Sequence, residues 1–165
     1  MKGINNMHIR EMDEEDNQIM EQIIKRSLES FNLDIPGTAY FDPQLGRLSQ
    51  FYKKQPNAKY WVAVNKQNEV VGGVGIASFA GKPETCELQK LYITPAYQGR
   101  GFAKKLMKTA LDFAGNHYTY CYLETMEKLQ AANHLYSQLG FRELDSALEG
   151  SEHSTMDTWL FKNLS

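Results

Sequence analysis

Hydrophobic and polar residues alternate along the chain with two different periods. Short runs rich in β-branched and aromatic residues, bounded by polar turns, predict strands. Longer segments in which apolar residues recur every three to four positions predict helices with one buried face. Strands are expected at 7–12, 60–64, 70–79, 84–93, 119–125, 141–144 and 155–162. Helices are expected at about 14–31, 42–54, 101–115 and 128–139.

Two local signals refine these boundaries. Asp13 precedes three acidic residues, which favour the positive end of a helix dipole and therefore predict a helix start there. Asp42 stands before Pro43, so Asp42 is expected to be the N-cap of the second helix, with proline in its first turn. The three glycines at 72, 73 and 75 faintly suggest a dinucleotide-binding loop, but the context is strand followed by strand. They are interpreted as a bulge or a close backbone approach within the third strand.

Composition narrows the class of protein. With 165 residues and 42% hydrophobic content, the chain is expected to form a single domain over 1–165, of which 1–6 are a disordered lead-in. A net charge of −2 gives no footprint for a nucleic-acid partner. No apolar run approaches the length of a membrane span and no signal-peptide core is present, so a cytoplasmic protein without a membrane partner is expected. Cys86 and Cys121 have no metal-binding spacing, so they are interpreted as buried thiols, and no metal is expected.

The most informative stretch is 91–103, where an apolar strand passes through Pro95 and a glycine-bearing turn into a helix. Gly99 and Gly101 carry no Cβ that would keep a ligand from the backbone. The first N–H groups of a helix have no intrahelical partner and lie at its positive end. This stretch therefore predicts a phosphate-bearing ligand.

The spacing Gln98-x-x-Gly101-x-Ala103 after Leu91-x-Ile93 resembles the acetyl-CoA site of the Gcn5-related N-acetyltransferase (GNAT) superfamily. The resemblance continues through 123–125 and 132–141, in the family's order. It implies an α/β (α+β) GNAT fold: a mixed, mostly antiparallel sheet of six to seven strands, splayed between strands 4 and 5 and flanked by four helices. It also implies an acetyl-CoA-dependent enzyme that transfers the acetyl group to a primary amine by direct attack in a ternary complex.

The resemblance assigns contacts to acetyl-CoA. The strand backbone around Leu91 would bind the pantetheine arm, and the Leu91 N–H would donate to the thioester oxygen. Backbone amides of the glycine turn and the helix start would hold the pyrophosphate. Leu129 stands where many family members have an asparagine, and Asn133 is either its substitute or an exposed polar residue of the helix. The cofactor-binding residues expected in this way are Leu91, Tyr92, Ile93, Gln98, Gly99, Arg100, Gly101, Phe102, Ala103, Lys104 and Asn133.

Two residues are expected to catalyse the transfer. Glu87 matches a family glutamate that acts as general base, and in a regular strand it would share a face with Gln89, Leu91 and Ile93. Tyr136 matches the family tyrosine that serves as general acid toward the leaving sulfur. The alternatives are a salt-bridged strand carboxylate and a core aromatic residue. Glu84 and Glu124 are weaker candidates for the base.

The acceptor is expected to be a small-molecule or peptide amine. Tyr40 and Phe41 lie in an insertion-like segment where the family builds one wall of the acceptor pocket. His153 is a second candidate base or a loop histidine, and Asp157 either holds a cationic amine or caps the strand pairing. An acyl-CoA sensor without turnover and an acetyltransferase for protein N-termini or lysines remain alternatives. The resemblance is also compatible with a homodimer, which no motif in the chain indicates.

Overall fold

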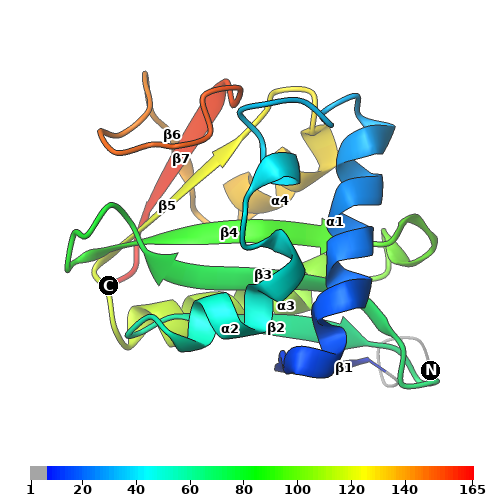
Figure 1. The fold of residues 1–165 in the computed structure, drawn as a ribbon. Helices are drawn as coiled ribbons and strands as arrows, with labels where there is room; N and C mark the ends of the chain where they lie inside the picture. Colours follow the sequence, from blue (N-terminus) through cyan, green and yellow to red (C-terminus); the bar gives the residue numbers. More distant parts are fainter. Residues whose placement is uncertain (1–6) are drawn as a thin grey trace.

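The computed structural model describes residues 7–165, so the expected lead-in at 1–6 lies outside the described part. Seven strands and four α-helices follow the predicted order (Figure 1). The strands are β1 (His8–Glu11), β2 (Lys59–Val64), β3 (Val70–Ser78), β4 (Thr85–Ile93), β5 (Tyr120–Thr125), β6 (Arg142–Glu143) and β7 (Thr158–Asn163). The helices are α1 (Asn17–Ser30), α2 (Leu48–Lys53), α3 (Phe102–Gly115) and α4 (Gln130–Gln138).

The strands form one mixed sheet in the order β1-β2-β3-β4-β5-β7-β6. All neighbouring strands are antiparallel except β4 and β5, which run parallel. Parallel neighbours need a crossover connection, and α3 supplies it. The predicted sheet, with its mostly antiparallel pairing and four flanking helices, is confirmed.

Two apolar cores lie on opposite faces of this sheet. Helices α1 and α2 cover one face, in front in Figure 1, around the buried Met20, Ile24 and Leu48. Helices α3 and α4 cover the other face, where Leu106 and Met107 are fully buried. Because the central strands are covered on both sides, β2 and β3 are buried along most of their length.

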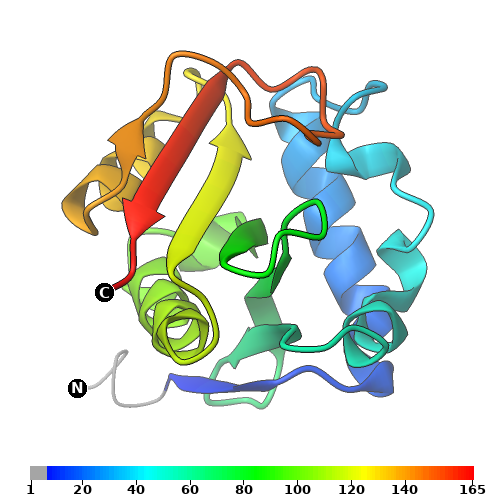
Figure 2. The same cartoon turned by 90° about the vertical axis from the view of Figure 1, so that its left-hand side faces the viewer.

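The sheet divides between β4 and β5. These strands pair only from Thr85 to Glu87 on β4 and from Tyr120 to Tyr122 on β5. Beyond Glu87 the strands diverge, and β5 with β7 turns away from the rest of the sheet (Figures 1 and 2). This divergence is the expected splay, and it leaves the second half of β4 paired with β3 alone.

A bulge in β4 corrects one prediction from the sequence. Lys90 has a left-handed backbone (φ 54°), and the register with β3 shifts between the pairs Gly75–Gln89 and Gly73–Tyr92. The extra residue reverses the alternation of side chains. Glu87 therefore shares its face with Gln89 and Tyr92, and the expectation that it shares one with Leu91 and Ile93 is wrong.

The interpretation of the β3 glycines as a close backbone approach is confirmed. A Cβ on Gly75 would lie 2.6 Å from the hydroxyl oxygen of Tyr52 and 2.7 Å from the Tyr60 ring. The absence of a side chain at Gly75 lets both tyrosines lie directly against the backbone. At the register shift between Gly73 and Gly75 the extra residue belongs to β4, so that bulge is not in β3.

The expected helix cap at Asp42 is also wrong. Asp42 ends a short 3₁₀ turn at Ala39–Phe41, and a second turn at Leu45–Arg47 leads into α2. The Asp42 carboxylate instead forms ion pairs with Lys90 and His153. In residues 7–165, no helix has both the length and the apolar character required to cross a membrane.

Candidate active site

A cavity of about 650 Å³ opens where β4 and β5 diverge. Its walls are the second half of β4, the turn into α3, the first half of α4 and the end of α1. Of the expected cofactor-binding residues, this cavity brings together Leu91, Tyr92, Ile93, Gln98, Gly99, Gly101, Ala103 and Lys104. Residues far apart in the sequence thus form one elongated site.

The start of α3 forms the anion-binding end of the cavity. Gly101 is the N-cap with φ 87°, and the first intrahelical hydrogen bond runs from the Lys105 N–H to the Gly101 carbonyl. The amides of Phe102, Ala103 and Lys104 therefore have no partner within the helix. A Cβ at Gly99 would enter open space. This arrangement fits a pyrophosphate, because it offers backbone donors and a positive helix end with room for close approach.

The side chains around this turn mostly stabilise its shape. Gln98 donates from Nε2 to the Ile93 carbonyl at 2.9 Å, which ties the turn to the end of β4. The Phe102 ring is buried in the core and packs edge-on against Tyr97. The Arg100 guanidinium stacks over the Tyr97 ring at 4.9 Å. For Phe102, only the backbone amide is placed to contact a ligand.

Glu87 lies at the last position at which β4 pairs with β5, and it lines a smaller cavity of about 60 Å³. Both cavities share Leu28 and Tyr92 as lining residues. Burial raises the pKa of Glu87 to about 7, although a 2.8 Å hydrogen bond from Gln89 Nε2 acts in the opposite direction. A carboxyl group that titrates near neutrality can accept a proton from an amine and release it again.

Sequence reasoning missed the residues that orient Glu87. The Tyr52 hydroxyl donates to Gln89 Oε1, which fixes the amide so that its Nε2 donates to Glu87 Oε1. Tyr52 belongs to α2, and its hydroxyl lies against Gly75. The glycine-rich β3 was the one sequence signal for this contact, because small residues opposite aromatic ones indicate close packing.

Tyr136 projects from α4 into the core on the other face of the sheet, where its ring meets Phe141. Burial, and to a smaller extent the nearby Cys121, raise the pKa of the Tyr136 hydroxyl. Tyr136 thus keeps its proton at neutral pH, as a general acid must. Tyr136 is not among the residues that line either of the two cavities.

His153 is brought to the smaller cavity together with Glu87. Its Nε2 lies 3.1 Å from Asp42 Oδ1, and this hydrogen bond raises the pKa of His153 despite burial. Lys90 was not anticipated from the sequence. Its Nζ lies 3.0 Å from Asp42 Oδ2, and its side chain is only 4% exposed.

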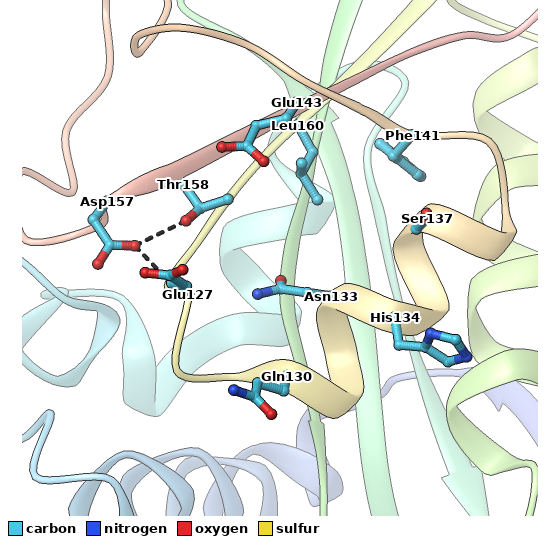
Figure 3. Close-up of a pocket in the computed structure, with 10 residues that line it drawn as sticks. All are labelled: Glu127, Gln130, Asn133, His134, Ser137, Phe141, Glu143, Asp157, Thr158 and Leu160. Atoms are coloured by element: carbon cyan, nitrogen blue, oxygen red, sulfur yellow. Dashed lines mark hydrogen bonds between the residues drawn. The ribbon is translucent and has the colours of Figure 1, made fainter.

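Other expected site residues lie elsewhere. Asn133 faces a separate cavity between α4 and β7, where its Nδ2 donates to the Met126 carbonyl (Figure 3). Asp157 borders that same cavity and accepts from the Glu127 N–H and the Thr158 hydroxyl, so it caps the chain where β5 leads into α4 (Figure 3).

Tyr40 donates its hydroxyl to Glu29, and Phe41 is 60% exposed. Neither aromatic residue lines the cavity beside Glu87. Within 7–165 no cluster of three or more His, Cys, Asp or Glu side chains is arranged for a metal ion.

Comparisons with known proteins point the same way as the geometry. The sequence pattern of the acetyltransferase (GNAT) family matches residues 20–141. An uncharacterized N-acetyltransferase, YjgM of Escherichia coli K12, is 38% identical over 159 residues, which are 94% of each chain. N-acetylaspartate synthetase of Xenopus tropicalis is 34% identical over 70% of this chain but only 44% of its own length.

Solved structures share the fold at lower sequence identity. A GNAT-family acetyltransferase from Staphylococcus aureus Mu50 superposes with a TM-score of 0.80 at 21% identity, covering 96% of this chain and 99% of its own. Spermidine N-acetyltransferase from Vibrio cholerae, solved with CoA and spermine, has a TM-score of 0.69 at 19% identity and covers 97% and 96%. At these identities the likeness concerns the fold.

Proposed function

The chain belongs to the acetyltransferase (GNAT) family, and from this premise we propose that it transfers an acetyl group from acetyl-CoA to a primary amine by direct attack in a ternary complex. The observation that carries the proposal is the junction of two cavities at the divergence of β4 and β5. The larger ends at the unpaired amides of α3, and the smaller contains Glu87. Acetyl-CoA would supply the activated thioester.

The residues that would hold acetyl-CoA follow from the larger cavity. The amides of 102–104 and the open space at Gly99 suit the pyrophosphate. The Lys104 ammonium, which lines the same cavity, adds positive charge. The edge of β4 from Leu91 to Ile93 supports the pantetheine arm, with the Leu91 N–H as donor to the thioester oxygen. Asn133 has no such support, because its side chain faces the other side of α4.

Two side chains move protons in the proposed reaction. Glu87 accepts a proton from the acceptor ammonium and thereby frees the nitrogen lone pair for attack on the carbonyl carbon. As the new C–N bond forms and the C–S bond breaks, the Tyr136 hydroxyl donates its proton to the leaving sulfur. The nitrogen then releases its second proton, which restores the Tyr136 hydroxyl by way of solvent, and Glu87 returns the first proton to solvent. The pKa of about 7 suits Glu87 to its role, and the raised pKa of Tyr136 suits it to remain protonated until that step.

Further parts of the proposal rest on the resemblance. The chain is proposed to act as one domain over 1–165, and cytoplasmic location and a homodimer stay predictions. Several relatives have the name N-acetylaspartate synthetase, so the acceptor proposed here is a small amine, with a protein N-terminus or lysine as the alternative.

The proposal is tested by measuring CoA release from acetyl-CoA in the presence of amino acids, polyamines, aminoglycosides and short peptides. Acceptor-dependent release is expected for at least one class. Calorimetry with acetyl-CoA alone measures binding separately. Binding without release toward any amine would favour the acyl-CoA sensor, and the absence of both would contradict the proposed site.

A further inference from the structure

The cavity beside Glu87 has charges of opposite sign on its walls. It is lined by two acidic residues, Glu87 and Glu124, and by two basic ones, Lys90 and His153. At about 60 Å³ it has room for a few waters or for the polar end of a short ligand. A ligand at this end of the site therefore meets charged groups next to the apolar side chains of Leu28, Leu88 and Met156.

The basic wall is built by the fold and is not a solvated surface. The bulge that gives Lys90 its left-handed backbone lies three residues beyond Glu87. The Lys90 side chain is 4% exposed and its ammonium meets Asp42 at 3.0 Å. Burying an ammonium costs several kcal/mol unless it is paired, so this contact fixes the position of Lys90.

Asp42 serves two cations at once. His153 Nε2 lies 3.1 and 3.2 Å from the two oxygens of the carboxylate that also pairs with Lys90. Asp42 comes from the loop before α2 and His153 from the loop before β7, so the cluster joins the two loops beside the cavity. With His153 protonated, two positive charges share one carboxylate, and one positive charge remains uncompensated within the cluster.

The acidic wall is organised separately. Tyr122 donates its hydroxyl to Glu124 Oε2 at 2.7 Å, and Gln89 donates to Glu87. Both cations lie close enough to Glu87 for their charges to lower its pKa, while the charge of Glu124 raises it. One small cavity thus presents an anionic side suited to an ammonium and a cationic side suited to a carboxylate.

We infer that the acceptor is a free amino acid or a comparably short amino-carboxylate, whose amine lies beside Glu87 while its carboxylate binds Lys90 and His153. The inference rests on the proposed function and names the substrate class of that site. A carboxylate would restore the balance of two cations against two anions around Asp42. The second ammonium of a polyamine, in contrast, would be brought against Lys90 and His153 and repelled.

The test compares matched acceptors with and without the carboxylate. Amidation also lowers the pKa of the α-amine, which by itself favours the amide, so a preference for the acid is evidence for a carboxylate contact. CoA-release kinetics are measured for a panel of free amino acids, for the amide of each, and for spermidine. At least one amino acid should have a kcat/KM ten-fold or more above that of its amide. Equal use of acid and amide, or turnover of spermidine alone, would overturn the inference and leave the proposed function intact. No release with any amine would contradict the proposed function itself.

Substitutions then test which side chain is responsible for the preference for the acid over the amide. Lys90→Met keeps the length of the side chain and removes its charge, so the acid-to-amide ratio should fall at least ten-fold, through KM for the acid. Lys90→Arg keeps the charge and should retain most of the ratio. Lys66→Met, in the exposed β2–β3 turn, is the matched control.

Calorimetry with acetyl-CoA shows whether each variant is still folded. A ratio that stays the same in folded Lys90→Met would assign Lys90 a structural role only and would refute the inference. If Lys90→Met does not fold, His153→Gln provides the same comparison from the other cation.

Discussion

Glu87 is a largely desolvated carboxyl group, a setting that raises a carboxyl pKa toward neutrality and suits the base role proposed for it. It lies at the last position at which β4 pairs with β5, and its pKa of about 7 reflects desolvation that the hydrogen bond from Gln89 and the charges of His153 and Lys90 offset only in part. Charged side chains are rarely buried without a partner. The charged form of Glu87 therefore destabilises the folded state, which is not expected of a residue that serves folding alone.

Replacement of Glu87 by Gln should lower the rate of acetyl transfer by roughly 10²–10⁴-fold, the usual contribution of a general base. In the wild type, kcat/KM should rise with pH through about 7, because Glu87 must lose its proton to act. The variant should lose this limb of the pH profile and keep its affinity for acetyl-CoA. If the kinetics do not change, the base lies elsewhere, with His153 as the next candidate.

The same substitution should stabilise the fold at neutral pH. The pKa of Glu87 is raised from 4.5 to about 7 in the folded protein, so the folded state holds the proton more tightly than the unfolded state does. Wild-type stability therefore falls as pH rises from about 4.5 to about 7. Relative to wild type, Glu87→Gln should gain up to ~3 kcal/mol in free energy of unfolding at pH 8, and this gain should vanish near pH 4. Urea unfolding at the two pH values measures it.

Helix α2 acts on the site through one hydroxyl group. Tyr52 fixes the Gln89 amide, and Gln89 donates to Glu87. In Tyr52→Phe the amide is free to rotate, so the charged form of Glu87 loses part of its donor and its pKa should rise. The ascending limb of the pH profile should move up by about 0.5–1 pH unit, a modest shift of the kind lost hydrogen bonds produce.

Tyr118→Phe is the matched control for this change. The Tyr118 hydroxyl donates to the Asn57 carbonyl at 2.7 Å, away from the cavity beside Glu87. Both variants lose one hydrogen bond of a buried tyrosine, but only Tyr52→Phe should move the limb. If the ascending limb moves equally in Tyr52→Phe and Tyr118→Phe, the shift reflects a general loss of core packing and not the contact with Gln89.

The turn before α3 can be tested against a turn of the same geometry. Gly99 and Gly81 have φ of 76° and 72°, and at both positions a Cβ would meet nothing within 4 Å. Alanine in this region costs roughly 1–2 kcal/mol at either site. Gly99→Ala should also raise the Kd for acetyl-CoA, by about ten-fold if one methyl group costs about 1.4 kcal/mol of binding. Gly81→Ala should leave the Kd unchanged, and equal affinities would contradict the assignment of the pyrophosphate end.

The elements could be predicted from the sequence because their signals are local. Periodicity predicts the strands and helices to within about three residues, except that α2 begins at Leu48 and not at the expected Asp42. The glycine turn marks the start of α3. The bulge could not be predicted, because a lysine with positive φ has no signature in the sequence. The extra residue in β4 reverses the alternation of side chains, so Glu87 and Leu91 lie on opposite faces of the sheet. The prediction that they share a face is wrong for this reason.

At the scale of the whole molecule, the site depends on contacts that no sequence pattern reveals. Asp42 was interpreted as a helix cap, and Lys90 carried no signal. They meet His153 only because two loops and a bulged strand converge after folding. The expected acceptor contacts at Tyr40, Phe41 and Asp157 were placed by position in the chain, which does not determine where a loop side chain points.

Acetyl-CoA should stabilise the molecule, because the cavity proposed to bind it is lined by β4, α4 and the start of α3. At a concentration of 100 times its Kd, binding adds about 2.7 kcal/mol. For a protein of this size that corresponds to a rise in Tm of about 5–11 °C. Acetyl-pantetheine, which lacks the pyrophosphate, should give a much smaller rise at equal concentration. Equal shifts in differential scanning fluorimetry would mean that the α3 amides do not contribute.

The two cysteines occupy an informative place in this architecture. Cys86 and Cys121 are partners across the short paired segment of β4 and β5, both fully buried and both free. A thiol reagent can reach them only when these strands separate, so the rate of labelling counts such openings. The two native cysteines can therefore report how often β4 and β5 separate, and no foreign label has to be introduced.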